Sequence, residues 1–228
     1  AKETHKKPKS CGEILKNINF VHRQNDMTPT FVLHAYIKGG ISFENQSNNG
    51  IYNLIAKNMT YGHKDLAYEE LKHYLETHSA YLSGFSGKNA YGLTLHGQTQ
   101  DFTQLSEHFF KTLTTPSYPH RYLQLEKELL KRSFHLQKED PVKQCFRKFN
   151  QLVFNNHPYA MDIVGNNESL KGINRKSLIN THQERIQESK IIFSYCGDQD
   201  IETVLETLNP YLQKFQNRKK SQPVKSKI

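Results

Sequence analysis

The chain has 228 residues, 36% of them hydrophobic, and a formal net charge of +9 at pH 7. This length predicts one large domain or two small ones with a real core. No apolar run approaches the ~20 residues that a membrane-spanning helix needs. Residues 1–11 are net +3 and residues 217–228 net +5, so the body between them is nearly neutral. This distribution disfavours a nucleic-acid surface, and we interpret the basic ends as solvated extensions.

The first half of the chain predicts a strand, two helices, a hairpin and another helix. Alternating apolar residues indicate the strand, which ends at a Gly-Gly turn, and helical spacing indicates the helices. The elements are expected over residues 28–40, 48–62, 65–77, 79–97 and 101–115.

The second half predicts mainly helices, with one late strand. Helices are expected over residues 119–138, from Pro141 onward, near 175–188 and from Asp200 onward, and the strand over 190–200. Because strands cluster early and one returns late, the expected fold class is α+β, with an antiparallel or mixed sheet packed on several helices. The expected organisation is an N-terminal extension (1–20), one domain (21–216) and a basic tail or linker (217–228).

Apolar stripes on the middle helices predict core packing. The stripes include Leu125 and Leu129 on one helix, Val142, Cys145, Phe149, Leu152 and Val153 on the next, and the aromatic residues Phe109, Phe110, Tyr122, Phe134, Phe146 and Phe149. The three cysteines, Cys11, Cys145 and Cys196, are too far apart for a metal-binding pair, and the last two are expected to be buried thiols. None of the twelve histidines is paired at i, i+3 or i+4, so a replacement zinc site is not expected.

Six stretches in chain order carry a family resemblance. They are IKGGISFENQSNNG, YGHKDLAYEELKHYLETHSAYLSGFSGKNAYGLTL, LTTPSYP, LEKELLKRSFHLQKEDP, HPYAMDIVGNNESLKGINRKSLINTH and SYCGDQD. Together they resemble the motifs of the pitrilysin/insulinase family of zinc metallopeptidases, the relatives of mitochondrial processing peptidase. The resemblance runs from about Thr28 to Phe215 and implies the half-unit fold of that family.

The resemblance also locates the family's zinc motif. In such enzymes the two His of a His-x-x-Glu-His motif on one helix and a Glu on a later helix hold Zn²⁺, and the Glu between the two His activates the metal-bound water. Aligned on its flanking glycines, the motif falls on Asn53–Lys57, which reads NLIAK. Asn53 and Lys57 then stand at the His positions, Ala56 at the Glu position, and Ser133, about 76 residues after Lys57, at the third ligand. The resemblance therefore implies a domain with no metal, no cofactor and no peptidase activity of its own.

The implied function is a non-catalytic half that helps enclose and bind peptide beside a catalytic, zinc-bearing half-unit, in the same chain or in another subunit. Thr30, Val32, His34 and Tyr36, on the first predicted strand, are the expected edge for peptide addition. A structural subunit without a role in proteolysis, like the inactive relatives in respiratory complex III, stays open as an alternative. So does a stand-alone peptide-binding module, whereas nucleic acid is not an expected partner. The compartment is unknown, and an extracytoplasmic one is expected if the source is bacterial.

Overall fold

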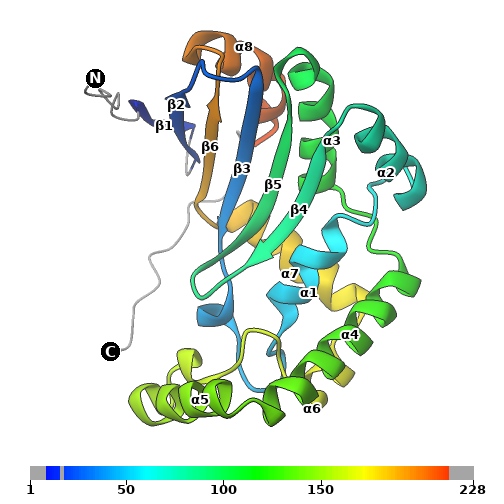
Figure 1. The fold of residues 1–228 in the computed structure, drawn as a ribbon, viewed down its shortest axis with the longest axis vertical. Coiled ribbons are helices and arrows are strands. Elements are labelled where there is room, and N and C mark those ends of the chain that lie inside the picture. The colour runs from blue at the N-terminus through cyan, green and yellow to red at the C-terminus, as the bar shows by residue number, and fades with distance from the viewer. Residues whose placement is uncertain (1–8, 16–17, 216–228) are drawn as a thin grey trace.

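The computed structural model describes residues 9–15 and 18–215, in which one β-sheet is covered by helices (Figure 1). The strands are β1 (Lys9–Leu15), β2 (Ile18–Gln24), β3 (Thr30–Lys38), β4 (Tyr81–Ser86), β5 (Ala90–Gln98) and β6 (Ile191–Gly197). The helices are α1 (Ile51–Met59), α2 (Tyr68–Thr77), α3 (Phe102–Thr114), α4 (His120–Glu139), α5 (Pro141–Phe154), α6 (Asn167–Gly172), α7 (Arg175–Glu188) and α8 (Ile201–Leu212). The α+β class expected from the sequence is confirmed.

The strand order of the described sheet is β1-β2-β6-β3-β5-β4. Only the pairing of β2 with β6 is parallel, so the sheet is mixed. The last strand of the chain thus lies between two of the first strands, and Phe193 is registered with both Phe20 and Ala35.

Strand β3 is an interior strand, which corrects the expectation that Thr30, Val32, His34 and Tyr36 form a free edge. It pairs with β5 along its whole length and with β6 from Phe31 to Ile37. Because its backbone groups are already used on both sides, no peptide can add to it.

The sheet also begins earlier than the sequence indicated. The expected N-terminal extension over residues 1–20 contains β1 and most of the inward-facing part of β2, where Ile18 and Phe20 are fully buried. Two apolar residues in alternation are too short a pattern to stand out from a polar segment. The expected tail, residues 217–228, lies outside the described residues.

The core lies on the sheet face that α1, α3, α7 and α8 cover (Figure 1). Strand β3 shows how the sequence produces this arrangement, since Phe31, Leu33, Ala35 and Ile37 alternate inward and are all buried. As expected, Phe109, Phe110 and Phe134 are buried too. No helix in the described part of the chain is both long and apolar enough to span a membrane.

Helix α5 contradicts the prediction of a buried apolar stripe. None of its residues is buried, and the large apolar side chains Val142, Phe146, Phe149, Leu152 and Val153 are between 56% and 83% exposed. Cys145 is exposed rather than buried, and Cys196 is half-buried. The helix lies at the opposite end of the molecule from α8 (Figure 1), where no other described element covers this stripe.

Helix α4 departs from the prediction in part: of its expected apolar stripe Leu125, Leu129 and Leu130, the first two are 48% and 43% exposed, whereas Leu130 is buried. Both helices are amphipathic, as the sequence indicated. Apolar periodicity shows that a helix has an apolar side, but the element that covers that side is a property of the tertiary structure.

Candidate functional site

The candidate site is the seam between α1 and α4. The Tyr61 ring, just past α1, stacks on Tyr122 near the start of α4 with ring centroids 4.3 Å apart. Lys57, one turn before Tyr61, forms an ion pair with Glu126, one turn after Tyr122. The two helices therefore run in opposite directions along the seam. Ser133, two turns beyond Glu126, projects from the same side of α4 by helical geometry.

An ion pair occupies the middle of the seam. Lys57 Nζ donates to Glu126 Oε2 at 3.1 Å, and Tyr61 Oη donates to Oε1 at 2.6 Å. The Glu126 side chain is only 7% exposed, whereas that of Lys57 is 40% exposed. Burial and the hydrogen bond to Glu126 raise the pKa of Tyr61, so the phenol remains a donor at neutral pH. Both carboxylate oxygens thus have fixed partners.

The other two positions in α1 to which the resemblance assigns the zinc motif are Asn53 and Ala56. Ala56 is 1% exposed, and Gly84 of β4 packs on its backbone, where an added Cβ would come 1.8 Å from the Ala56 carbonyl oxygen. Asn53 is half-buried, and its Oδ1 is buried without a hydrogen-bond partner in the described part of the chain.

These residues do not fit a zinc ion. The side chains at Asn53, Ala56, Lys57 and Ser133 are an amide, a methyl group, an ammonium and a hydroxyl, whereas zinc sites in proteins are built from imidazoles, thiolates and carboxylates. The Lys57 ammonium adds a positive charge that would repel a dication. Across the described residues, no three or more His, Cys, Asp or Glu are grouped so as to hold a metal ion.

Glu126 is the residue of this site that sequence reasoning missed. Counting along the family motif led to Ser133, and Glu126 lies seven residues earlier. Seven residues are almost two helical turns, so a search along the same helix face would have found this carboxylate.

A second buried carboxylate orients α1. Glu44 accepts hydrogen bonds from the backbone N–H of Gly50 at 2.8 Å and of Tyr52 at 3.1 Å, and from Asn49 Nδ2 at 2.8 Å. These are free donors at the start of a helix, where a negative charge is favourable. Burial nevertheless raises the pKa of Glu44. The carboxylate therefore caps the N-terminus of α1, and it also lines a polar cavity of about 550 Å³.

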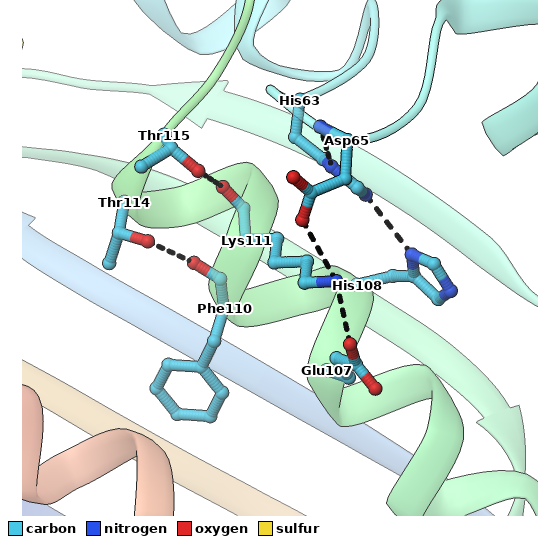
Figure 2. Close-up of polar contacts among 8 residues, drawn as sticks. All are labelled: His63, Asp65, Glu107, His108, Phe110, Lys111, Thr114 and Thr115. Atoms are coloured by element: carbon cyan, nitrogen blue, oxygen red, sulfur yellow. Dashed lines mark hydrogen bonds and ion pairs between the residues drawn. The ribbon is translucent and has the colours of Figure 1, made fainter.

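Outside the seam, the side chains of His63 and His108 contact each other (Figure 2). The two residues are so far apart in the sequence that their spacing gives no hint of this contact. His63 Nδ1 accepts from the Asp65 backbone N–H at 3.2 Å, so Nε2 carries the proton and donates to His108 Nδ1 at 3.1 Å. Beside the pair, Lys111 bridges Asp65 at 3.0 Å and Glu107 at 2.6 Å. Burial, with the neighbouring imidazole, lowers the pKa of His63 to about 4, and burial also lowers that of His108. Both rings are therefore neutral at pH 7.

Strand β4 is the edge of the sheet nearest to the seam. Its inner side pairs with β5, and no strand in the described residues pairs with its outer side. An opening of about 300 Å³ lies at its start, lined by the apolar and aromatic side chains of Tyr61, Tyr68, Leu71, Leu75, Tyr81 and Leu82 together with the polar ones of Thr60, Lys72 and Glu76. An edge strand beside a partly apolar pocket is an arrangement that can take an extended peptide.

Comparison with known proteins gives a fold but no sequence family. No protein-family model matches the sequence. No curated protein matches it either. Among solved structures, the chain is similar to the crystal structure of a peptidase M16 inactive domain from Pseudomonas fluorescens, with a TM-score of 0.83 and 15% identity over 95% of this chain. It is also similar to a protease from Helicobacter pylori, with a TM-score of 0.81 and 15% identity over 96% of this chain. The match spans about half of each solved chain, 52% in both cases. The protein therefore has the fold of a peptidase M16 inactive domain.

Proposed function

We propose that this chain is a non-catalytic peptidase-like domain that helps bind peptide substrate beside a catalytic, zinc-bearing half, in the same chain or in a separate subunit. The ion pair between Lys57 and Glu126 carries this proposal. It lies in the seam where the family resemblance places the zinc ligands, and together with the hydrogen bond from Tyr61 it leaves neither oxygen of Glu126 without a partner. Zinc and the base that activates water are then functions of the partner half.

The proposal includes the loss of zinc binding at Asn53, Ala56, Lys57 and Ser133. Zn²⁺ added to the purified protein is expected to bind at well below one ion per chain, as measured by equilibrium dialysis with metal analysis. Stoichiometric zinc would contradict the proposal. The combined variant Asn53→His, Ala56→Glu, Lys57→His and Ser133→Glu is expected to gain zinc binding, and its failure to do so would count against the alignment.

We further propose β4, in place of β3, as the strand to which peptide adds. The free outer side of Tyr81–Ser86 offers backbone hydrogen bonds, and the pocket at its start offers apolar contact for one side chain of the peptide. Backbone NMR of the domain titrated with an extended peptide is the direct test. Shifts are expected along β4, and shifts confined to other strands would contradict this part of the proposal.

The alternative is a structural subunit with no role in proteolysis. The buried Ala56 and the close approach of β4 to α1 are equally compatible with it. The discriminating experiment combines the chain with a half-unit that carries His-x-x-Glu-His and measures cleavage of a fluorogenic peptide. Activity that depends on both components supports the proposed function. A complex whose activity is the same with and without this chain supports the structural alternative.

A further inference from the structure

The exposed apolar side chains of this molecule are concentrated in one place. Of the eleven exposed large hydrophobic residues in the described part of the chain, eight belong to α4 and α5. On α5 they form a stripe with Cys145, here called the α5 face: Val142, Cys145, Phe146, Phe149, Leu152 and Val153. The intervals of three and four residues repeat over three turns, which is the pattern of a helix that packs on another protein surface.

The outward direction of the α5 face is set by contacts on the other side of the helix. Arg147 lies over the ring of the buried Phe134, with its guanidinium carbon 5.3 Å from the ring centroid. Asp140 caps the helix by accepting from the backbone N–H of Val142 at 3.0 Å and of Lys143 at 3.1 Å. The polar side of α5 is thus attached to the body, and the apolar side faces away from it.

The charges around the α5 face select its occupant. Helix α5 contains Lys143, Arg147 and Lys148 and no acidic residue. Lys143 and Lys148 are exposed and project on opposite sides of the stripe, about 120° and 100° from its centre by helical geometry. Lys143 also pairs with Asp140 at 3.6 Å, whereas Lys148 has no acidic neighbour within its own helix. A second copy of this chain would bring like charges together, and the ends of the chain are basic as well. An apolar surface with an acidic rim is complementary.

We infer that α5 is a docking helix for a protein surface that is apolar at its centre and acidic at its rim, carried by the partner half. That the partner half carries this surface rests on the proposed function, whereas the chemistry of the surface is inferred from α5 alone. Cys145 gives a natural reporter, because its exposed thiol lies within the face.

The test uses a synthetic amphipathic helix with leucines on one face and glutamates on both flanks. Saturating peptide is expected to slow the alkylation of Cys145 about tenfold, as followed by peptide mass spectrometry, with Cys196 as the internal reference. A peptide of the same pattern with lysines in place of glutamates is expected to give no protection. Absence of protection, or equal protection by both peptides, would overturn the inference.

Two variants separate the α5 face from exposed apolar surface in general. Phe146→Glu with Phe149→Glu is expected to weaken peptide binding more than tenfold, because both anchors are lost and like charges meet. Met27→Glu, at a residue that is 83% exposed and outside α4 and α5, is expected to leave peptide binding unchanged. Equal effects of the two variants would contradict the assignment.

Two other occupants of the α5 face, a second copy of the chain and a lipid surface, would each give a different experimental result. Concentration-dependent dimers in analytical ultracentrifugation, abolished by the double variant, would assign the face to a second copy. Cosedimentation with phosphatidylglycerol vesicles, abolished in the same way, would assign it to a lipid surface. Either result overturns the inference. If the double variant still binds the catalytic half with unchanged affinity, the docking inference fails while the proposed function stands; if the unaltered chain does not bind that half, the proposed function fails.

Discussion

Glu126 is a nearly buried carboxylate whose charge is compensated from two sides, by the ammonium of Lys57 and the phenol of Tyr61. A buried charge is costly unless it is paired and hydrogen-bonded, so these two contacts determine whether the α1–α4 seam is stable.

Replacing Lys57 by Met tests this dependence. The variant keeps the aliphatic stem but leaves Glu126 with one partner, so we expect it to lower the free energy of unfolding by about 1 to 3 kcal/mol. Urea denaturation at pH 7 measures the change. Adding Glu126→Gln is expected to recover part of the loss, because the neutral amide does not need the ammonium.

Lys72→Met is the matched control. Lys72 pairs with Glu76 at 3.7 Å, but both side chains are more than half exposed. Exposed pairs of this kind contribute less than about 1 kcal/mol. If both lysine variants lose the same stability, the pair in the seam has no special role.

Single residues were predicted from the sequence only where a motif named them. Asn53, Ala56, Lys57 and Ser133 came from the family pattern. Glu126 was missed, because its contact with Lys57 joins residues 69 positions apart. The histidine pair was missed for the same reason, since His63 and His108 are 45 positions apart and on different elements.

Helix α1 and strand β4 approach each other so closely that the contact depends on a glycine. At Gly84 an added Cβ would overlap the carbonyl oxygen of Ala56, which is backbone and cannot rotate away. The glycine therefore sets the distance between the proposed peptide-binding edge and the seam.

Gly84→Ala is expected to destabilise the domain by about 3 kcal/mol, because the overlap can be relieved only by moving β4 away from α1. Thermal unfolding followed by circular dichroism measures the effect. Gly87→Ala, in the same hairpin, would place the new Cβ 3.7 Å from the Ala90 carbonyl oxygen and is expected to change stability by less than about 1 kcal/mol. Equal melting temperatures for the Gly84→Ala variant and the unaltered chain would show that the backbone adjusts freely.

The sequence predicted the helices and strands better than it predicted which elements pack against one another. The strand ending at the Gly-Gly turn, the hairpin and the long helices all exist, because periodicity and capping residues such as Asp200 are local signals. The position of β3 inside the sheet was not predictable, because it depends on β6 arriving from about 155 residues away. The outward face of α5 was not predictable either, because an apolar stripe does not say what covers it.

At the scale of the whole molecule, burial lowers the pKa of several histidines in the described part of the chain, among them His63, His108 and His182. His182 is 1% exposed and lies between the Leu113 carbonyl, to which Nε2 donates at 2.7 Å, and the Tyr91 hydroxyl, 2.9 Å from Nδ1. Burial lowers its pKa to about 4. With His63 and His108, it forms a set that must be neutral in the folded protein.

Stability is therefore expected to fall as pH decreases from about 6.5 to 4. In this range the unfolded chain binds protons at these histidines and the folded chain does not, so the unfolded state gains stability; above pH 6.5 the effect is absent. His182 alone accounts for about 3 kcal/mol at pH 4. Protonation of Glu44, whose pKa is raised by burial, offsets a part of this loss.

Denaturant unfolding at several values between pH 7.5 and 4.5 measures this dependence. His182→Gln is expected to be less stable at pH 7 but to show a shallower dependence on pH. A free energy of unfolding that is constant from pH 7.5 to 4.5 would contradict the assignment of neutral, buried imidazoles.

The placement of β6 has a consequence for how the protein is made. Strands β2 and β3 leave the ribosome about 155 residues or more before β6, the strand that joins them and ends at Gly197. Until that residue has emerged, each has an edge of unpaired backbone N–H and C=O groups, which is a template for aggregation. Contacts between residues so distant in sequence also form slowly. The nascent chain is therefore expected to need protection by a chaperone between the synthesis of β3 and that of β6, and the sheet to close only when β6 enters it.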